Sequence, residues 1–166
     1  MKLFLYAGLV VVIAPIQATL LHYVSFFGVR PDLGLVAACL VGFLGGELDG
    51  LLLGLLLGYS QDMFSAGDLW VNVVTKGGAG FLAGLAGRHM AHLTPAVLAV
   101  GLAVLSCLSS AVFLSSLAPS SPEELWIGVR STIVLQAAFD AGIGVLLYLL
   151  FRQQWSDDRM VTDGAL

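Results

Sequence analysis

The chain has 166 residues, of which 58% are hydrophobic and 11% are charged, and its formal net charge is −4. A water-soluble surface requires roughly a quarter of all residues to be charged, so this composition, with a mean hydropathy of +0.96, excludes an ordinary soluble domain and predicts an integral membrane protein. The acidic groups gather at segment ends and in the C-terminal tail, so the negative balance does not indicate nucleic acid or a basic partner.

Apolar runs separated by charged residues and prolines predict about six membrane-crossing helices in one transmembrane domain, residues 1–166. In chain order we expect helices at residues 3–27, 33–47, 50–62, 70–90, 95–117 and 125–151. A polar cytoplasmic tail at 152–166 follows, and we expect it to be disordered. The expected fold class is therefore an all-α integral membrane protein, a compact bundle of transmembrane helices.

The second and third segments are each too short to cross a hydrocarbon layer of about 30 Å upright at about 1.5 Å per residue. Glu47 and Asp49 between them favour a water-exposed turn, because two carboxylates at mid-membrane would cost several kcal/mol. The alternative is a five-helix chain in which residues 33–62 form a re-entrant pair. The sequence leaves this choice open.

The distribution of Lys and Arg predicts that both termini are cytoplasmic. With this orientation the inside receives Lys2, Arg88, Arg152 and Arg159, whereas the outside receives Arg30. The tryptophans and tyrosines fall near predicted segment ends, where their amphipathic rings favour the interface. The first helix follows a basic residue as a signal peptide does, but no clear small-residue cleavage site follows it, so we expect it to be retained.

Glycines at four-residue spacing form the most regular pattern in the chain. Gly50, Gly54 and Gly58 are four residues apart, and Asp62 follows Gly58 at the same spacing. On a helix these four positions form one stripe. Helices in lipid associate through such small residues, and the next predicted helix carries a second glycine-rich face. The stripes serve either tight packing within the bundle or docking of a partner's helix. The candidate residues are Gly50, Gly54, Gly58, Gly80 and Gly84.

Ionisable residues inside predicted helices are candidates for function, because a charge within the bilayer is costly. Lys76 lies roughly 9 Å, and Arg130 roughly 8 Å, below the outer end of its helix. Asp62 ends its own helix at the outer face, so either cation can pair with it. We expect this pairing to be structural rather than part of a transport path. The candidate outer polar cluster is Asp32, Asp62, Lys76 and Arg130.

Asp140 is expected near the cytoplasmic side, because it lies roughly 22 Å from the outer end of its predicted helix. By depth, Arg88 is the first candidate partner of this inner charge and His89 the second. The alternative is a carboxyl group that faces the bundle and is partly protonated or hydrogen-bonded. Gln17 is expected to form a hydrogen bond between helices, a contact of about 1 kcal/mol.

Enzyme signatures such as GxSxG, HExxH and the phosphate-binding GxxxxGK loop do not occur in the chain. His22 is predicted near the outside, whereas His89 and His92 are predicted near the inside, which argues against a shared metal or acid/base site. Cys39 and Cys107 lie singly in apolar runs without metal-ligating spacing. We therefore predict no catalytic activity and no cofactor.

Several of these features follow one another in an order that resembles a known family. They are Gln17 in the first helix, Pro31-Asp32-Leu33 before the second, Gly54, Gly58 and Asp62 in the third, and Phe64-Ser65-Ala66-Gly67 before the fourth. Together with the length and the helix count, this order resembles the rod shape-determining protein MreD family across most of the chain. The family often has a basic turn between the second and third helices, where this chain has Glu47 and Asp49.

The resemblance implies a non-enzymatic scaffold of the elongasome in the bacterial inner membrane. Such a scaffold would bind MreC directly and, through the complex, MreB filaments and the elongation-specific peptidoglycan synthase, supporting lateral cell-wall synthesis and cell shape. The MreD family is also similar in fold to the substrate-binding subunits of energy-coupling-factor vitamin transporters. A transporter subunit is therefore the alternative function, with the outer polar cluster as its candidate substrate site.

Overall fold

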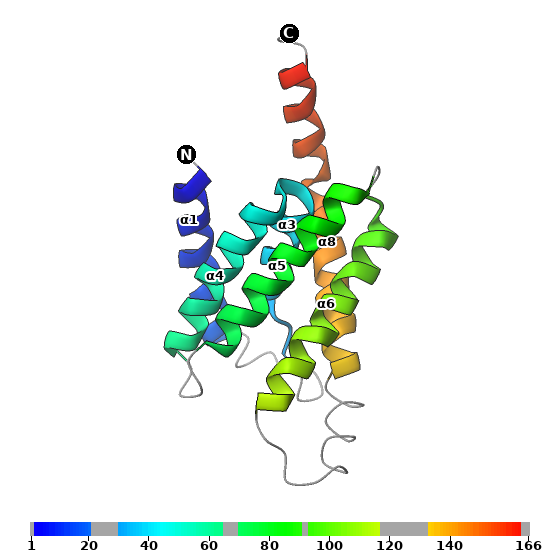
Figure 1. Cartoon of the computed structure of the whole chain (residues 1–166). Helices are drawn as coiled ribbons and strands as arrows, with labels where there is room; N and C mark the ends of the chain where they lie inside the picture. The colour runs from blue at the N-terminus through cyan, green and yellow to red at the C-terminus, as the bar shows by residue number, and fades with distance from the viewer. Residues whose placement is uncertain (1, 21–29, 65–69, 91–92, 117–132, 164–166) are drawn as a thin grey trace.

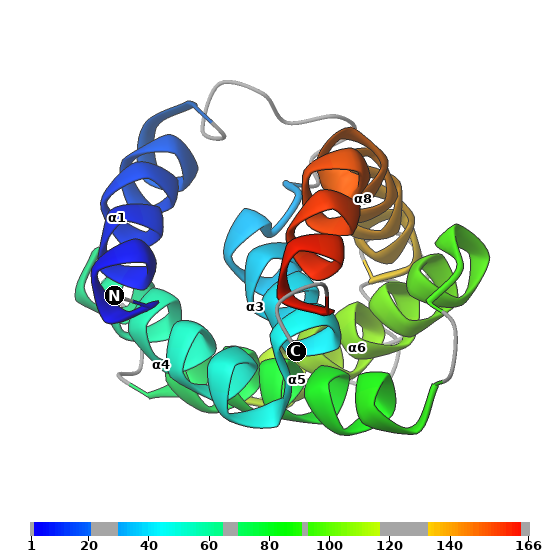
Figure 2. The same ribbon diagram turned by 90° about the horizontal axis from the view of Figure 1, so that it is seen from above.

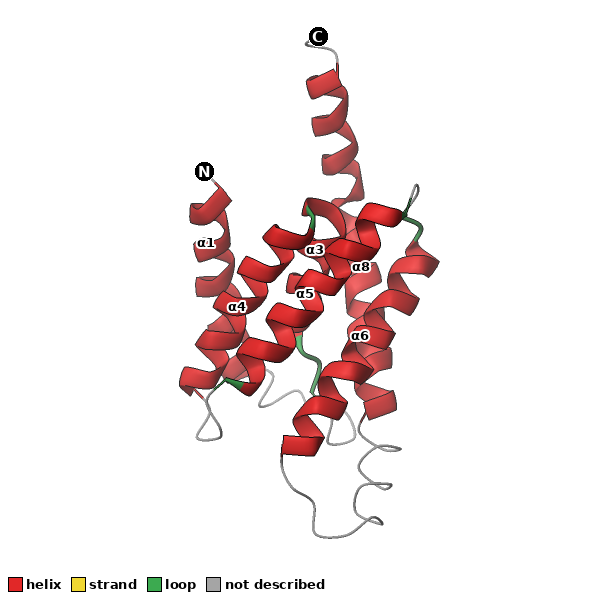
Figure 3. Ribbon diagram, in the orientation of Figure 1, coloured by secondary structure: helices red, strands yellow, loops and turns green. Residues whose placement is uncertain are grey.

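A computed structural model describes residues 2–20, 30–64, 70–90, 93–116 and 133–163 of the chain. The only regular secondary structure of these residues is helical (Figure 3), namely six α-helices and one short π-helix. In chain order the elements are α1 (Lys2–Pro15), the π-helix η1 (Ile16–Leu20), α3 (Leu33–Gly45), α4 (Glu47–Phe64), α5 (Val71–His89), α6 (Pro95–Ser116) and α8 (Val134–Asp163). The prediction of an all-α chain with six helices is confirmed for the described residues.

Consecutive α-helices alternate in direction along the bundle (Figure 1). α1, α4 and α6 run away from the end that carries both termini, and α3, α5 and α8 return to it. The opposite end, where α3, α5 and α8 begin, is called the distal end below. Viewed along the bundle, α3 lies centrally between α1 and α8, with α4, α5 and α6 along one side (Figure 2). α3 contacts every other α-helix, so it forms the core of the bundle.

A single glycine, Gly46, separates α3 from α4. Its φ of 104° lies in the left-handed region, which glycine adopts without steric cost. Glu47 and Asp49 form the first turn of α4, where negative charge interacts favourably with the helix dipole. The expected turn through both acidic residues is therefore wrong. The chain reverses at one residue, and α4 is longer than predicted, about 27 Å from its 18 residues.

Two other predicted boundaries differ from the structure. α1 ends at Pro15 and is followed by a π-helix. Pro15 lacks the backbone N–H that would form an α-helical hydrogen bond. The rest of the expected first helix, 21–27, lies outside the described residues. At the other end, α8 continues to Asp163 and projects beyond the other helices (Figure 1). The prediction of a disordered tail is therefore wrong for residues 152–163.

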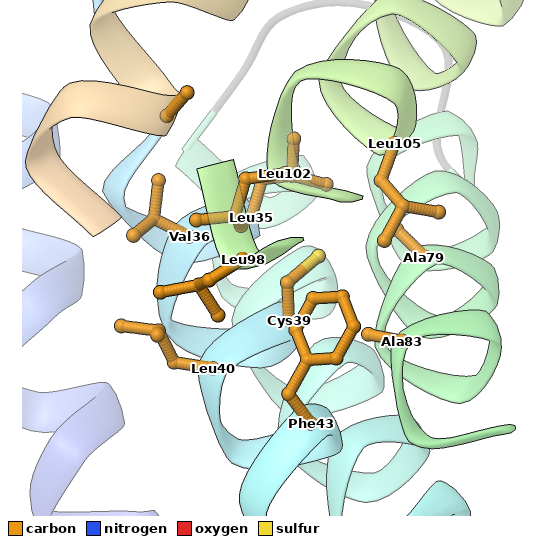
Figure 4. Close-up of a cluster of buried hydrophobic side chains, with 11 residues drawn as sticks. Leu35, Val36, Cys39, Leu40, Phe43, Ala79, Ala83, Leu98, Leu102 and Leu105 are labelled. Atoms are coloured by element: carbon orange, nitrogen blue, oxygen red, sulfur yellow. The ribbon is translucent and has the colours of Figure 1, made fainter. Parts of the chain in front are cut away.

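The main apolar core lies where α3 packs against α5, α6 and α8 (Figure 4). Its buried side chains are Leu35, Val36, Cys39, Leu40 and Phe43 of α3, Ala79 and Ala83 of α5, Leu98, Leu102 and Leu105 of α6, and Ala141 of α8. A second cluster, Tyr6, Leu53 and Leu57, packs α1 against α4. Alanines on α5 leave room for the larger side chains of α3 and α6, so these helices pack closely.

Large apolar side chains also cover the outside of the bundle. α6 exposes Val100, Val104, Leu108 and Val112, and α4 exposes Leu48, Leu52, Leu56 and Met63. The α6 set recurs every four residues and the α4 set at spacings of four and seven, so each set forms one face of its helix. Two stretches, Pro95–Phe113 and Val134–Phe151, are long and apolar enough to cross a membrane. The described part of the chain thus places many large apolar groups outside and, as shown next, several charged groups inside.

Candidate functional site

A buried ion pair joins the start of α3 to α5. Lys76 Nζ lies 2.8 Å from Asp32 Oδ2, and the lysine side chain is only 1% exposed. The same ammonium group donates a hydrogen bond to Asn72 Oδ1, 2.8 Å away and one turn earlier in α5. Of the predicted outer polar cluster, Asp32 and Lys76 are therefore brought together. Arg130 lies outside the described residues.

Asp32 also organises the backbone around it. Its Oδ1 accepts hydrogen bonds from the N–H of Leu35 at 3.0 Å and from Nε2 of Gln17 at 2.8 Å. The first bond caps the N-terminus of α3, whose leading N–H groups lack helical partners. The Oε1 atom of Gln17 accepts from the N–H of Gly34. Gln17 therefore fastens η1 to the start of α3, and the expected hydrogen bond between helices is found.

Asp140 belongs to the same cluster, contrary to the prediction. Its fully buried carboxylate accepts the N–H of Asp32 at 2.8 Å and the hydroxyl of Ser106 at 2.6 Å. Asp140 is six residues into α8, which begins at Val134, so it lies about 9 Å from the start of that helix rather than 22 Å. We call Gln17, Asp32, Asn72, Lys76, Ser106 and Asp140 the buried polar network.

Arg88 is not the partner of Asp140. It forms an ion pair with Glu47, Nη1 to Oε1 at 2.7 Å, and its side chain is 69% exposed. Glu47 begins α4 and Arg88 ends α5, so the pair joins these helices at the end of the bundle opposite the buried polar network. The predicted inner pair of Arg88 and Asp140 is therefore wrong.

Asp62 caps a helix instead of pairing with a lysine. It is 3% exposed, and its carboxylate accepts the backbone N–H groups of Trp70, Asn72 and Val73 at 3.0, 3.3 and 3.1 Å. The side-chain amide of Asn72 adds a fourth bond of 2.7 Å. These donors surround the N-terminus of α5, where the helix dipole favours an anion. The expected ion pair of Asp62 and Lys76 is therefore wrong.

Replacing Asp62 by Ala should destabilise the protein by about 1–3 kcal/mol, because several part-buried N–H groups lose their acceptor. Asp62→Asn keeps one carbonyl oxygen and should lose less. Melting temperatures measured in one detergent test this order. Equal melting temperatures for wild type and Asp62→Ala would remove the capping role.

The candidate glycines lie at the contact between α4 and α5. A Cβ atom added at Gly50 would overlap the carbonyl oxygen of Gly80, and one at Gly80 would overlap that of Gly50. Added at Gly54 it would meet the carbonyl oxygen of Lys76, at Gly58 that of Asn72, and at Gly84 the backbone of Glu47. Of the two uses considered for these residues, the structure shows packing within the bundle, at backbone-to-backbone distance.

A cavity of about 350 Å³ adjoins the buried polar network at the distal end. Gln17, Asp32 and Asn72 form part of its wall. Asn72 could have been found from the sequence, because it is a polar residue four positions before Lys76 on the same helix, where side chains are neighbours. Ser106 carried no such signal, because it is one of five serines in an otherwise apolar helix and nothing in the sequence distinguishes it.

Among the described residues, no group of three or more His, Cys, Asp or Glu side chains is arranged to hold a metal ion. Comparisons with protein-family profiles, curated proteins and solved structures find no match to this chain. The function is therefore inferred from the geometry of the buried polar network and from the order of the sequence motifs.

Proposed function

We propose that the protein is a non-enzymatic scaffold of the bacterial rod-shape complex, which binds MreC directly and through it supports MreB-linked peptidoglycan synthesis. The observation that carries this proposal is that each charged side chain of the buried polar network has its bonding partners within the chain. Asp32 is held by Lys76 and Gln17, and Asp140 by Ser106 and the backbone of Asp32. These bonds connect η1, α3, α5, α6 and α8 to one another. A rigid scaffold requires such connections.

The proposal places this scaffold in the inner membrane with both termini cytoplasmic. The exposed apolar faces of α4 and α6 and the buried charges support an apolar surrounding medium. The alternation of helix direction, with both termini at one end, agrees with the predicted Lys and Arg asymmetry. A single cysteine at Thr94, which is exposed at the end of the termini, should react with an impermeant maleimide only after the cells are opened. Labelling of intact cells would invert the orientation.

Co-expression with MreC tests the scaffold. Tagged protein extracted in mild detergent should retain MreC in a defined ratio, and an unrelated membrane protein of similar size, extracted in parallel, should not. Cells depleted of the protein should become round. Failure to retain MreC, together with unchanged cell shape after depletion, would refute the proposal.

The second candidate function, a substrate-binding subunit of an energy-coupling-factor transporter, is favoured by the cavity beside the buried polar network. Mass spectrometry of the same preparation separates the two functions. A bound vitamin or an associated energising ATPase would support transport, whereas MreC would support the scaffold.

A further inference from the structure

The cavity at the distal end has an unsatisfied acceptor on its wall. Gln61 of α4 lines it, and the Oε1 atom of this side chain is buried without a hydrogen-bond partner among the described residues. Buried polar atoms are normally hydrogen-bonded, and an unmade bond costs free energy. The other amides on the wall differ, because both ends of Gln17 and Asn72 are already bonded. The Oε1 atom of Gln61 can therefore accept a hydrogen bond from a donor outside the described residues.

The wall also offers a cation. Arg30 lines the cavity and is exposed, whereas Asp32 on the same wall is already held by Lys76. No ion pair joins Arg30 to any residue that the structure describes. A guanidinium group binds phosphate through two parallel N–H bonds. A ligand that matches both groups carries an anion, which binds Arg30, and a hydrogen-bond donor, which binds Oε1 of Gln61.

Aromatic side chains flank the same cavity. Phe64 at the end of α4 and Phe113 near the end of α6 line it, and they are 73% and 46% exposed. These rings provide apolar surface next to the polar wall, the combination that an amphiphile with a small polar headgroup requires. The volume of about 350 Å³ lies in the range of small-molecule sites, roughly 300–1,000 Å³.

We propose that this cavity binds a phosphate group with a neighbouring hydroxyl or ammonium donor, the phosphate at Arg30 and the donor at Gln61. A phospholipid headgroup and a soluble phosphate ester share this chemistry. Such binding goes beyond the scaffold function and does not depend on MreC.

Lipid retention by the full-length protein tests the proposal. Protein in mixed micelles is offered phosphatidylglycerol, phosphatidylethanolamine or phosphatidylcholine and analysed by native mass spectrometry. The first two lipids carry O–H or N–H donors beside the phosphate, whereas phosphatidylcholine carries none. We expect the first two to be retained about tenfold better, as the loss of one good hydrogen bond implies. Soluble glycerol phosphate is titrated in parallel.

Two variants show whether retention depends on the named groups. Gln61→Leu keeps the size of the side chain and removes the acceptor, so it should abolish the preference over phosphatidylcholine while the melting temperature does not fall. Arg30→Gln should weaken retention of all three lipids. The controls are Gln136→Leu and Arg88→Gln, which replace the same residue types away from the cavity and should leave lipid retention unchanged.

The outcomes separate the two sources. Lipid retention that depends on Arg30 and Gln61 identifies a headgroup site, and binding of glycerol phosphate alone with the same dependence identifies a soluble ester. Equal retention of the three lipids, unaffected by either variant and without binding of glycerol phosphate, would overturn the proposal.

Discussion

Gly54→Ala is expected to destabilise the protein and lower the amount that folds, although it adds only one methyl group. The new Cβ atom would overlap the carbonyl group of Lys76 and the Cα atom of Gly77. These are backbone atoms and cannot rotate away, so α5 must move as a unit. Overpacking of this kind costs about 1–3 kcal/mol, occasionally more, and moving α5 also strains the ion pair that it carries. Membrane abundance and size-exclusion profiles in detergent measure the loss.

Gly78→Ala is the matched control for this prediction. Gly78 also lies in α5, but a Cβ atom added there meets no atom within 4 Å. Alanine favours helix over glycine by up to about 1 kcal/mol, so this variant should be at least as stable as wild type. A Gly54→Ala protein that is as abundant, monodisperse and stable as Gly78→Ala would show that α4 and α5 do not pack at backbone distance.

Lys76→Met should destabilise the protein by about 3–5 kcal/mol, because it leaves the largely buried carboxylate of Asp32 without its cation. The carboxylate of Asp140 lies beside Asp32, since it accepts the backbone N–H of Asp32. The double variant Lys76→Met, Asp32→Asn removes both charges and should recover part of the loss. Melting temperatures and denaturant unfolding in one detergent give the comparison.

Arg88→Gln provides the control for the buried pair, since it breaks an ion pair whose arginine is 69% exposed. Solvent screening limits such a pair to under about 1 kcal/mol. If Lys76→Met lowered the melting temperature no more than Arg88→Gln, the ion pair would not stabilise the bundle. A double variant less stable than Lys76→Met would show instead that the Asp32 carboxylate stabilises the bundle through bonds other than its ion pair with Lys76.

The sequence alone determined the helical class and the need for close helix contacts. Long apolar runs with few charges predict helices, because only internal hydrogen bonding satisfies the backbone in an apolar medium. The four-residue spacing of Gly50, Gly54 and Gly58 predicts a flat helix face, and the structure shows that face against α5. A lysine within an apolar helix requires a partner, so a bond to Lys76 was predictable without its identity.

Only the tertiary structure decided which carboxylate that partner is. Counting residues from a predicted helix end gives the depth of Lys76 but not the direction in which it points, and Asp32 and Asp62 both precede α5 in the chain. The carboxylate of Asp62 accepts hydrogen bonds from the backbone N–H groups at the start of α5. The ammonium group of Lys76 pairs instead with Asp32. Asp140 joins them because α8 crosses the bundle beside the start of α3, a contact between residues 108 positions apart that no local pattern in the sequence encodes.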